Sequence, residues 1–511
     1  MACPVSNRKS IKMTDMKKPE KILIVGGGTA GWMAANLIAS RWQDVEVSLL
    51  ESDEIGIIGV GEGSTPHLKF FFDTINVPDS EWMPRCNGTY KNGISFVNWS
   101  SIPGFESYFH PFPAQTDDLL TVPIFLSHIR ERMQGNNANA HPDHYFLESY
   151  LTKHNLGPLP AESFPFGAAY GYHFDSNLLG QFLAEKAVDK GVERVFGTVT
   201  EVFVDSNGTL GSVRLDDDSI LEADFFIDCS GFRSLLLQDA LKVSFKSYKE
   251  NLFNDAAVVM PTGMSEIVPP ATRSTALSNG WAWKIPLINR YGNGYVYSTD
   301  YITPDEAEGE LRQHLGLLDA DVSARHLKMK VGRVERHWEK NCLAVGLSQG
   351  FIEPLEATAL ALSFETIMRF MKHYESGLYT TKFEDMFNSE INAKFDGVRD
   401  YIVCHYKANQ RKDTDYWRDN ADNANLSDNL SKILFLWENS EDFSRDIHIH
   451  GLSGSYQAKS WACLLAGYGV FPALESSKVN TDYRPPHDMD QLADFMRRCG
   501  LNFKIHNEIL S

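Results

Sequence analysis

A glycine turn between a buried strand and a helix constrains this 511-residue chain more than any other segment. Residues 21–25 form a short β-branched run, which is typical of a strand buried on both faces. The glycine turn over 26–31 follows, and the apolar residues 32–39 predict a helix. Residues 45–50 predict a second strand that stops at Glu51. This order predicts one βαβ unit that binds a dinucleotide.

Each glycine of the turn has a separate physical role in that interpretation. Gly26 permits the tight turn, Gly28 lets a pyrophosphate approach the backbone, and Gly31 lets the helix pack against the strand. Thr29 and Ala30 begin the helix, whose N-terminus would face the phosphates. The turn alone would be a weak signal, but the strand before it and the helix after it favour a dinucleotide site.

The spacing of later strands favours FAD over NAD. Glu51 would accept hydrogen bonds from a ribose diol, and an acid there disfavours a 2′-phosphate. Further strand-and-glycine segments occur only at 225–231 and 342–347. An NAD dehydrogenase would show several consecutive βαβ units, and we find none. Widely separated strands with long insertions on the substrate side are the layout of FAD-binding oxidoreductases.

Composition excludes some partners. The net charge is −19, which argues against a nucleic-acid partner, because its phosphates would be repelled. No apolar run approaches the roughly 20 residues that span a bilayer, so no membrane partner is expected. The seven cysteines are scattered and never in CxxC spacing, so we expect reduced thiols, no metal site and a cytoplasmic location.

Three regions are predicted. Residues 1–19 contain five Lys/Arg and no apolar core of a signal peptide, so we expect a flexible N-terminal extension. Residues 20–380 would form the α/β, Rossmann-like FAD domain of flavin monooxygenase type, with interleaved β-rich substrate-side insertions. Residues 381–511 would form a mostly helical region that covers the substrate. Helices are predicted over 176–190, 359–374, 383–407, 428–439 and 461–467, and strands of a hairpin or meander over 192–204 and 211–221.

Three further segments are not explained by these three regions. Trp281 and Trp283, at i and i+2, would place both rings on one face of a strand, where core packing is the plainer explanation. The loop 59–66 has an unusual glycine content, which suits backbone approach to a flat ligand. Lys91 would ordinarily be a solvated lysine.

These segments carry a resemblance to the flavin-dependent halogenases, over about residues 20 to 470. The sequence is similar in the glycine turn with Trp32-Met33, in Gly61-Glu62 and in Trp281-x-Trp283-x-Ile285-Pro286. The remaining matching motifs are Thr65-Pro66, Trp82-Met83, Cys86-Asn87, Tyr90-Lys91, His173-Phe174-Asp175, Asp228-Cys229-Ser230-Gly231-Phe232-Arg233 and Glu353-Pro354-Leu355-Glu356.

The resemblance implies a mechanism. FADH2, supplied by a separate NAD(P)H-dependent flavin reductase, would react with O2 and halide to give hypohalous acid. Lys91 matches the lysine that captures this acid, and Glu356 matches the glutamate that assists halogenation of an electron-rich aromatic substrate. Trp281 and Trp283 would separate the substrate from the flavin. His110 and Phe112 match the positions that sandwich the substrate ring.

The resemblance also places cofactor and halide contacts. FAD contacts are expected at the turn residues, Glu51, Glu62, Val199, Leu347 and Leu360. Backbone N–H groups of Thr358 and Ala359 would bind halide. The family's Glu-Ser-Thr-Gly is replaced here by residues 356–359, Glu-Ala-Thr-Ala, so bromide or iodide is as credible as chloride.

The substrate expectation rests on a second departure. Residues 447–461 lack the Tyr-Tyr pair with which tryptophan halogenases close over the free amino acid. Indoles or phenols are therefore better candidates than free tryptophan. The main alternative is an FAD-dependent aromatic monooxygenase on the same fold, which would hydroxylate the substrate and have no use for Lys91. A flavin-binding protein without catalysis is a third alternative, and a homo-oligomer stays open.

Overall fold

A six-stranded sheet carries the glycine turn in the computed structural model, which describes residues 18–52, 62–473 and 488–510. Its strand order is β21-β22-β13-β1-β2-β9, and all neighbours are parallel except β21 and β22. Its strands are β1 (Lys21–Val25), β2 (Glu46–Glu51), β9 (Glu193–Phe196), β13 (Phe225–Asp228), β21 (Trp338–Glu339) and β22 (Cys342–Ala344). Among the parallel neighbours only β1 and β2 are consecutive in sequence, so the layout predicted for an FAD-binding oxidoreductase is confirmed.

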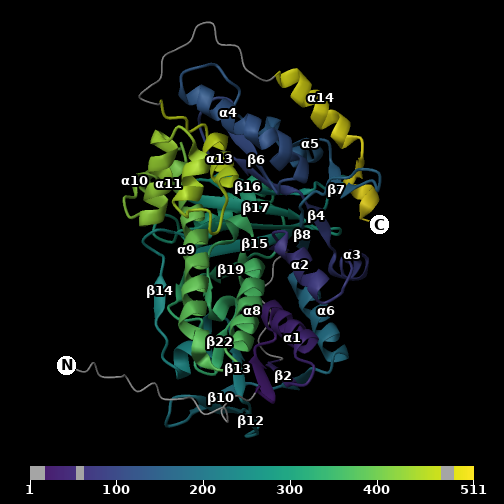
Figure 1. Ribbon diagram of the computed structural model, residues 1–511, viewed down its shortest axis with the longest axis vertical. Helices are drawn as coiled ribbons and strands as arrows, with labels where there is room; N and C mark the ends of the chain where they lie inside the picture. The colour runs from purple at the N-terminus through teal and green to yellow at the C-terminus, as the bar shows by residue number, and fades with distance from the viewer. Residues whose placement is uncertain (1–17, 53–61, 474–487, 511) are drawn as a thin grey trace, which may run out of the picture.

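A second, seven-stranded sheet lies above the first one in Figure 1. Its strand order is β19-β15-β18-β17-β16-β5-β6, and only the β16–β5 pair is parallel. Its strands are β5 (Gly93–Val97), β6 (Ser107–Pro111), β15 (Ala256–Thr262), β16 (Ala271–Leu277), β17 (Gly280–Pro286), β18 (Tyr291–Tyr297) and β19 (Arg325–Lys328). This sheet is the β-rich insertion that the sequence predicts between the strands of the FAD domain.

Four smaller sheets accompany these two in the described part of the chain. One joins β3 (Glu62–Gly63), β8 (Gly171–Phe174) and β4 (Thr89–Lys91). The others contain β10 (Val199–Val204), β11 (Leu210–Leu215) and β12 (Ile220–Glu222); β14 (Phe245–Ser247), β20 (Gly332–Val334) and β23 (Gly350–Phe351); and β7 (Leu156–Pro160) with β24 (Phe503–Ile505).

Helices cover both sheets. Helix α9 runs beside α8 along the left of Figure 1, and α10, α11 and α13 gather above it. The earlier helices are α1 (Thr29–Arg41), α2 (His67–Thr74), α3 (Asp79–Trp82), α4 (Val122–Met133), α5 (Leu147–Lys153), α6 (Ser176–Asp189), α7 (Pro304–Leu315) and α8 (Ala359–Ser376). The later ones are α9 (Glu384–Ala408), α10 (Asp415–Asp422), α11 (Asp428–Asn439), α12 (Phe443–Ile449), α13 (Ala458–Gly467) and α14 (Met489–Gly500).

The predicted helices are confirmed, but both predicted strands near residue 200 were too long. The run 192–204 is two strands, because β9 pairs with β2 whereas β10 pairs with β11. The run 211–221 also splits, into β11 and β12. Asp218 turns the chain there with φ +67°, and the Asp217 carboxylate accepts the backbone N–H of Ser219 at 2.9 Å. An Asp-rich segment favours such a turn over a continuous strand.

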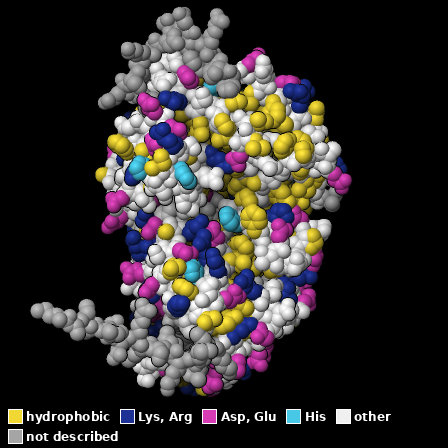
Figure 2. Space-filling model, viewed as in Figure 1, with side chains coloured by type: hydrophobic (Ala, Val, Ile, Leu, Met, Phe, Trp, Pro, Cys, Tyr) yellow, Lys and Arg dark blue, Asp and Glu magenta, His cyan; other side chains and the backbone are white. Residues whose placement is uncertain are grey.

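The surface and the thiols agree with the composition. Acidic and basic side chains are interspersed over the face shown in Figure 2. None of the helices in the described part of the chain is long and apolar enough to cross a membrane. The six described cysteines are free thiols, and no cluster of metal-binding side chains occurs among the described residues. The loop 59–61, most of the extension 1–19 and the segment 483–486 lie outside the described residues.

Candidate active site

A cavity of about 520 Å³ extends from the glycine turn to the seven-stranded sheet. Its wall includes every predicted cofactor and halide residue except Gly31, together with Lys91 and both tryptophans of β17. These predicted residues are Gly26, Gly28, Thr29, Ala30, Glu51, Glu62, Val199, Leu347, Leu360, Thr358, Ala359, Lys91, Trp281 and Trp283. Residues more than 300 positions apart in sequence therefore share one cavity.

The glycine turn has the shape that a flavin dinucleotide requires. Gly26 has φ +119°, and a Cβ there would lie 2.1 Å from the carbonyl oxygen of Cys229. A Cβ on Gly31 would lie 2.0 Å from the carbonyl oxygen of Gly26, so this glycine lets the helix pack against the turn. Gly28 faces open space within the cavity, with no atom within 4 Å of a built Cβ. The three roles expected from the sequence agree with this geometry.

Two helix N-termini line the cavity. Helix α1 follows Gly28 and helix α8 follows Thr358, and neither cap makes a side-chain hydrogen bond. Neither helix has an acidic residue in its first turn. First-turn N–H groups have no acceptor within their own helix, so both ends can bind anions. The end of α1 suits a pyrophosphate, and the N–H groups near Thr358 and Ala359 suit a halide.

Glu51 lies at the edge of the cavity, paired with a cation. The Nε of Arg194 donates to Glu51 Oε1 at 2.5 Å, and a Cβ on Gly27 would lie 1.8 Å from Oε2. The guanidinium also lies 4.8 Å from the ring centre of Phe196. This pair holds the carboxylate beside the turn, where it was expected to meet a ribose.

Asp228 organises the part of the cavity wall that lies beside the glycine turn. Its Oδ2 accepts the backbone N–H groups of Leu236 and Leu237, both at 2.8 Å. Its Oδ1 accepts the Ser230 hydroxyl at 2.6 Å and the Ser230 N–H at 3.0 Å. The carboxylate and the two leucines are fully buried, whereas Ser230 is partly buried and lines the cavity. One side chain therefore fixes the turn from Ser230 to Arg233, which lines the cavity.

Lys91 is a buried cation at the far end of this cavity. It ends β4 opposite Gly171, and its side chain is inaccessible to solvent. Its Nζ has no hydrogen-bond partner among the described residues and lies 5.3 Å from the ring centre of Phe112. Burial lowers the pKa of the ammonium to about 7, and the nearby carboxylate of Glu356 opposes that shift. An unpartnered, buried amine that titrates near neutrality is a mark of a functional group.

Glu356 faces Lys91 from a short turn after β23. It ends the turn Pro354–Glu356 and is followed by Ala357 in the left-handed region, with φ +56°. Such a conformation is strained for a residue other than glycine, and strain of this kind is common at functional sites. Burial raises the pKa of Glu356, whereas His110 and Lys91 lower it.

His110 completes the group on the substrate side. It lies on β6, and burial lowers its pKa to about 4, so the imidazole is neutral at pH 7. The Tyr401 hydroxyl lies 3.4 Å from its ring nitrogens. The structure thus brings together all four residues expected here: Lys91, Glu356, His110 and Phe112. Glu356, His110 and Phe112 do not line the large cavity itself.

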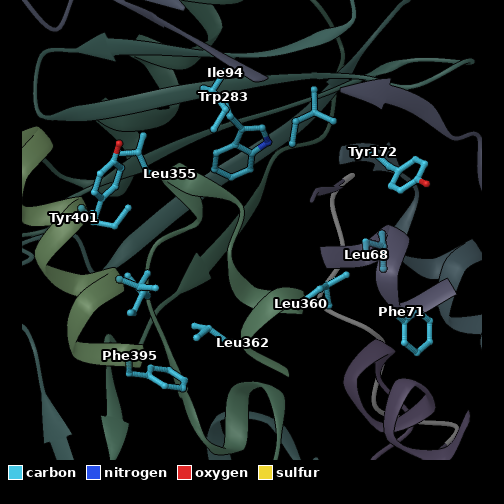
Figure 3. Close-up of a cluster of buried hydrophobic side chains, with 14 of the residues drawn as sticks. Leu68, Phe71, Ile94, Tyr172, Trp283, Leu355, Leu360, Leu362, Phe395 and Tyr401 are labelled. Atoms are coloured by element: carbon cyan, nitrogen blue, oxygen red, sulfur yellow. The ribbon is translucent and has the colours of Figure 1, made fainter. Parts of the chain in front are cut away.

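The tryptophan pair of β17 lines the same cavity as Lys91. Trp281 and Trp283 have ring centres 6.0 Å apart, and both line the cavity. Trp281 Nε1 donates to Glu353 Oε2 at 2.8 Å, which ties β17 to the turn that bears Glu356. Both rings also belong to the buried core, and Figure 3 shows Trp283 in one hydrophobic cluster with Leu355 and Tyr401. The pair therefore packs the core and lines the cavity at once.

Helix α9 contributes residues that the sequence analysis missed. His405, Tyr401 and Tyr406 approach the site from this helix, although they lie 45 or more positions beyond Glu356. No local motif marks them, because they read as ordinary residues of an amphipathic helix. Only the packing of α9 against α8 brings them to the turn 354–356.

Comparisons with known proteins agree with this geometry. The family model described as tryptophan halogenase matches residues 21–482. The chain is 37% identical over 486 residues to the 7-chloro-L-tryptophan 6-halogenase KtzR of Kutzneria sp. (strain 744), covering 90% of this chain and 92% of that one. It is 36% identical over 482 residues to the tryptophan 6-halogenase SttH of Streptomyces toxytricini, covering 89% and 90%.

Solved structures show the same fold. The crystal structure of SttH superposes with a TM-score of 0.83 at 32% identity, covering 96% of this chain and 99% of that one. BrvH, a flavin-dependent halogenase from Brevundimonas sp. BAL3, superposes with a TM-score of 0.83 at 30% identity, with the same coverage. The predicted α/β fold is confirmed. With a glycine turn fit for a flavin and a family match over most of its length, the chain belongs to the tryptophan halogenase family of flavin-dependent halogenases.

Proposed function

We propose that this flavin-dependent halogenase uses Lys91 and Glu356 to transfer halogen from hypohalous acid to an electron-rich arene. The observation that carries the proposal is the buried Lys91 amine, which lines the flavin cavity without a hydrogen-bond partner and faces Glu356. Bound FADH2 with O2 would supply the oxidising power that converts halide to hypohalous acid.

The transfer step balances with the residues present. The arene π electrons form the C–X bond as the O–X bond of hypohalous acid breaks. The Lys91 ammonium donates a hydrogen bond and then a proton to the departing hydroxide, which leaves as water. Glu356 accepts the proton that the arene loses, and proton exchange between the two residues restores the site. A pKa near 7 lets Lys91 give and regain this proton at neutral pH.

The substrate is an indole or phenol type arene rather than free tryptophan. The names of KtzR and SttH describe enzymes that act on tryptophan or its chlorinated form. In this chain the segment 447–461 contains no Tyr-Tyr pair. Its residue that faces Glu356 is Tyr456, and burial raises the pKa of that phenol well above its usual range. A neutral phenol suits an uncharged arene better than the ammonium and carboxylate of an amino acid.

We expect product formation to require every component of the proposed reaction. The assay combines the protein with FAD, NADH, a separate flavin reductase, O2 and an arene panel, and reads products by mass spectrometry. Omission of halide or of the reductase should abolish the halogenated product. A hydroxylated product formed without halide would support the monooxygenase alternative instead. Flavin binding without any product would support the non-catalytic one.

Halide choice gives a second prediction. Ala359 is the first residue of α8, and its methyl group borders the cavity where the family has glycine. The helical backbone accepts this methyl group without strain, so the pocket changes in shape rather than in backbone conformation. Bromide and iodide are also oxidised more easily than chloride. We expect bromide or iodide to be used at least as well as chloride in competition assays. Strong chlorination with neither heavier halide accepted would contradict this.

A further inference from the structure

Two adjacent residues of helix α9 hold both acidic residues of the catalytic turn. His405 Nε2 lies 2.9 Å from Glu356 Oε1. The Tyr406 hydroxyl donates to Glu353 Oε2 at 2.7 Å, and Asn254 and Trp281 donate to the same oxygen. The turn 354–356 is therefore anchored at both ends by α9. Only the contact at Glu356 involves an imidazole, which can either donate or accept a hydrogen bond at the same nitrogen.

His405 is enclosed by protein on every side. Its side chain is 0% exposed, and its ring stacks on Phe96 with centres 4.6 Å apart and planes at 28°. Its second nitrogen, Nδ1, lies 2.6 Å from the hydroxyl of Tyr468. Burial lowers the pKa of this imidazole well below its usual range, so the ring is neutral. One ring nitrogen therefore bears a proton while the other accepts a hydrogen bond.

The two hydrogen bonds that join Tyr468, His405 and Glu356 can form with either of two arrangements of protons. When Glu356 is ionised, Nε2–H donates to its carboxylate and the Tyr468 hydroxyl donates to Nδ1. When Glu356 is protonated, its O–H donates to Nε2 and Nδ1–H donates to the Tyr468 oxygen. Both states keep two hydrogen bonds without moving a heavy atom. A side chain that could only donate to the carboxyl group, or only accept from it, would leave a buried polar atom unpaired in one of the two protonation states of Glu356.

We propose that His405 is a positioning residue for Glu356, which matches either protonation state of the carboxyl by exchanging its imidazole tautomer. The inference rests on the proposed function, because it gives Glu356 the role of accepting the arene proton. His405 contacts Oε1 in both states, so the carboxyl group keeps one position beside Lys91 whether or not it carries a proton.

The titratable groups around Glu356 determine which ionisations the pH profile of halogenation can report. Those that face it from the packed elements are His405, Lys91, His110, Tyr108, Tyr401, Tyr456, Cys463 and Tyr468. Burial raises the pKa of the tyrosines and the thiol well above their usual ranges. Among these groups, Glu356, Lys91 and His110 therefore remain as the ones whose ionisation can shape the halogenation profile.

His405→Phe keeps the ring and removes both nitrogens. The ionised carboxylate of Glu356 then loses a donor, so its pKa rises. We expect the acid limb of the halogenation profile to move up by about one pH unit. Turnover should fall on the order of 100-fold at pH 7. His405→Gln keeps a donor near Nε2 but cannot exchange roles, so we expect a smaller loss, about 10-fold, with the acid limb unmoved.

His128→Phe is the matched control. His128 is buried in α4, and its Nδ1 lies 2.7 Å from the hydroxyl of Tyr145, as Nδ1 of His405 does with Tyr468. This variant removes a buried His–Tyr hydrogen bond away from Glu356. We expect it to lower stability without changing the pH profile. A merely structural role of His405 predicts the same result for both histidines.

A double variant and a spectroscopic titration test whether His405 acts through Glu356 by exchanging its tautomer. His405→Phe combined with Glu356→Gln should be no slower than Glu356→Gln alone, because the histidine acts only through the carboxyl. In the flavin-free protein, ¹⁵N-histidine NMR, assigned from the His405→Gln spectrum, should show exchange from the Nε2–H to the Nδ1–H tautomer on acidification. Glu356→Gln should abolish this exchange. The titration itself is made on protein that retains His405, and a variant at this position is used only to assign its signals.

Failures of the two proposals look different. An unchanged tautomer across the pH range, or His405→Phe with the profile of His128→Phe, would overturn this inference while Glu356→Gln stays impaired. Wild-type halogenation by Glu356→Gln would instead overturn the proposed function.

Discussion

Lys91→Ala is expected to lower halogenated product by about a thousand-fold or more while leaving FAD binding within about two-fold of wild type. The amine lines the far end of the cavity, away from the glycine turn and Glu51, which would hold the dinucleotide. Removing it removes the group that captures hypohalous acid and polarises the departing oxygen. FAD affinity is measured by flavin fluorescence and product by mass spectrometry.

Lys91→Arg tests whether the positive charge of Lys91 is sufficient for activity or whether its ability to lose a proton is also needed. A guanidinium keeps the positive charge beside Glu356, but it does not lose a proton near neutral pH and is bulkier than an ammonium. We expect this variant to be nearly as inactive as Lys91→Ala. A diffusible scavenger of hypohalous acid should still report oxidant formation in both variants. Regioselective product from Lys91→Ala at near the wild-type rate would show that Lys91 only fills a buried space.

What the sequence could predict depends on how far a signal reaches along the chain. The βαβ unit at 21–51 was predicted because strand, turn and helix each have a local pattern. Helix α11 was predicted with its observed bounds, and in the structure Ser427 caps it by accepting the N–H of Leu430. The strands near residue 200 were predicted too long, because only pairing with β2 or β11 decides where each one ends.

The site residues also differ in whether a local sequence motif marks them. Lys91 and Glu356 were identified through motifs that lie beside them in sequence, and the structure places both side chains together. His405 has no such motif. Its contact with Glu356 spans 49 positions and depends on how α9 crosses the catalytic turn. Residues that act through another residue are therefore the part of an active site that needs three-dimensional information.

Asp228→Ala is expected to lower the free energy of unfolding by about 3–5 kcal/mol and to abolish detectable FAD binding. The carboxylate accepts the N–H groups of Leu236 and Leu237, and both Ser230 donors. Alanine would leave the N–H groups of the two leucines buried without an acceptor, and each such group costs roughly 1–3 kcal/mol. Denaturant unfolding and flavin fluorescence measure the two effects.

The loss of FAD binding follows from the place of this network. The turn from Ser230 to Arg233 lines the cavity directly beside Gly26, whose backbone packs on the Cys229 carbonyl group. Asp239→Ala is the matched control, because Asp239 lies in the same segment but is exposed and only pairs with Arg233 at 3.5 Å. Its removal should change stability by less than about 0.5 kcal/mol. Normal FAD affinity in Asp228→Ala would mean that the glycine turn and the α1 N-terminus hold the dinucleotide without this wall.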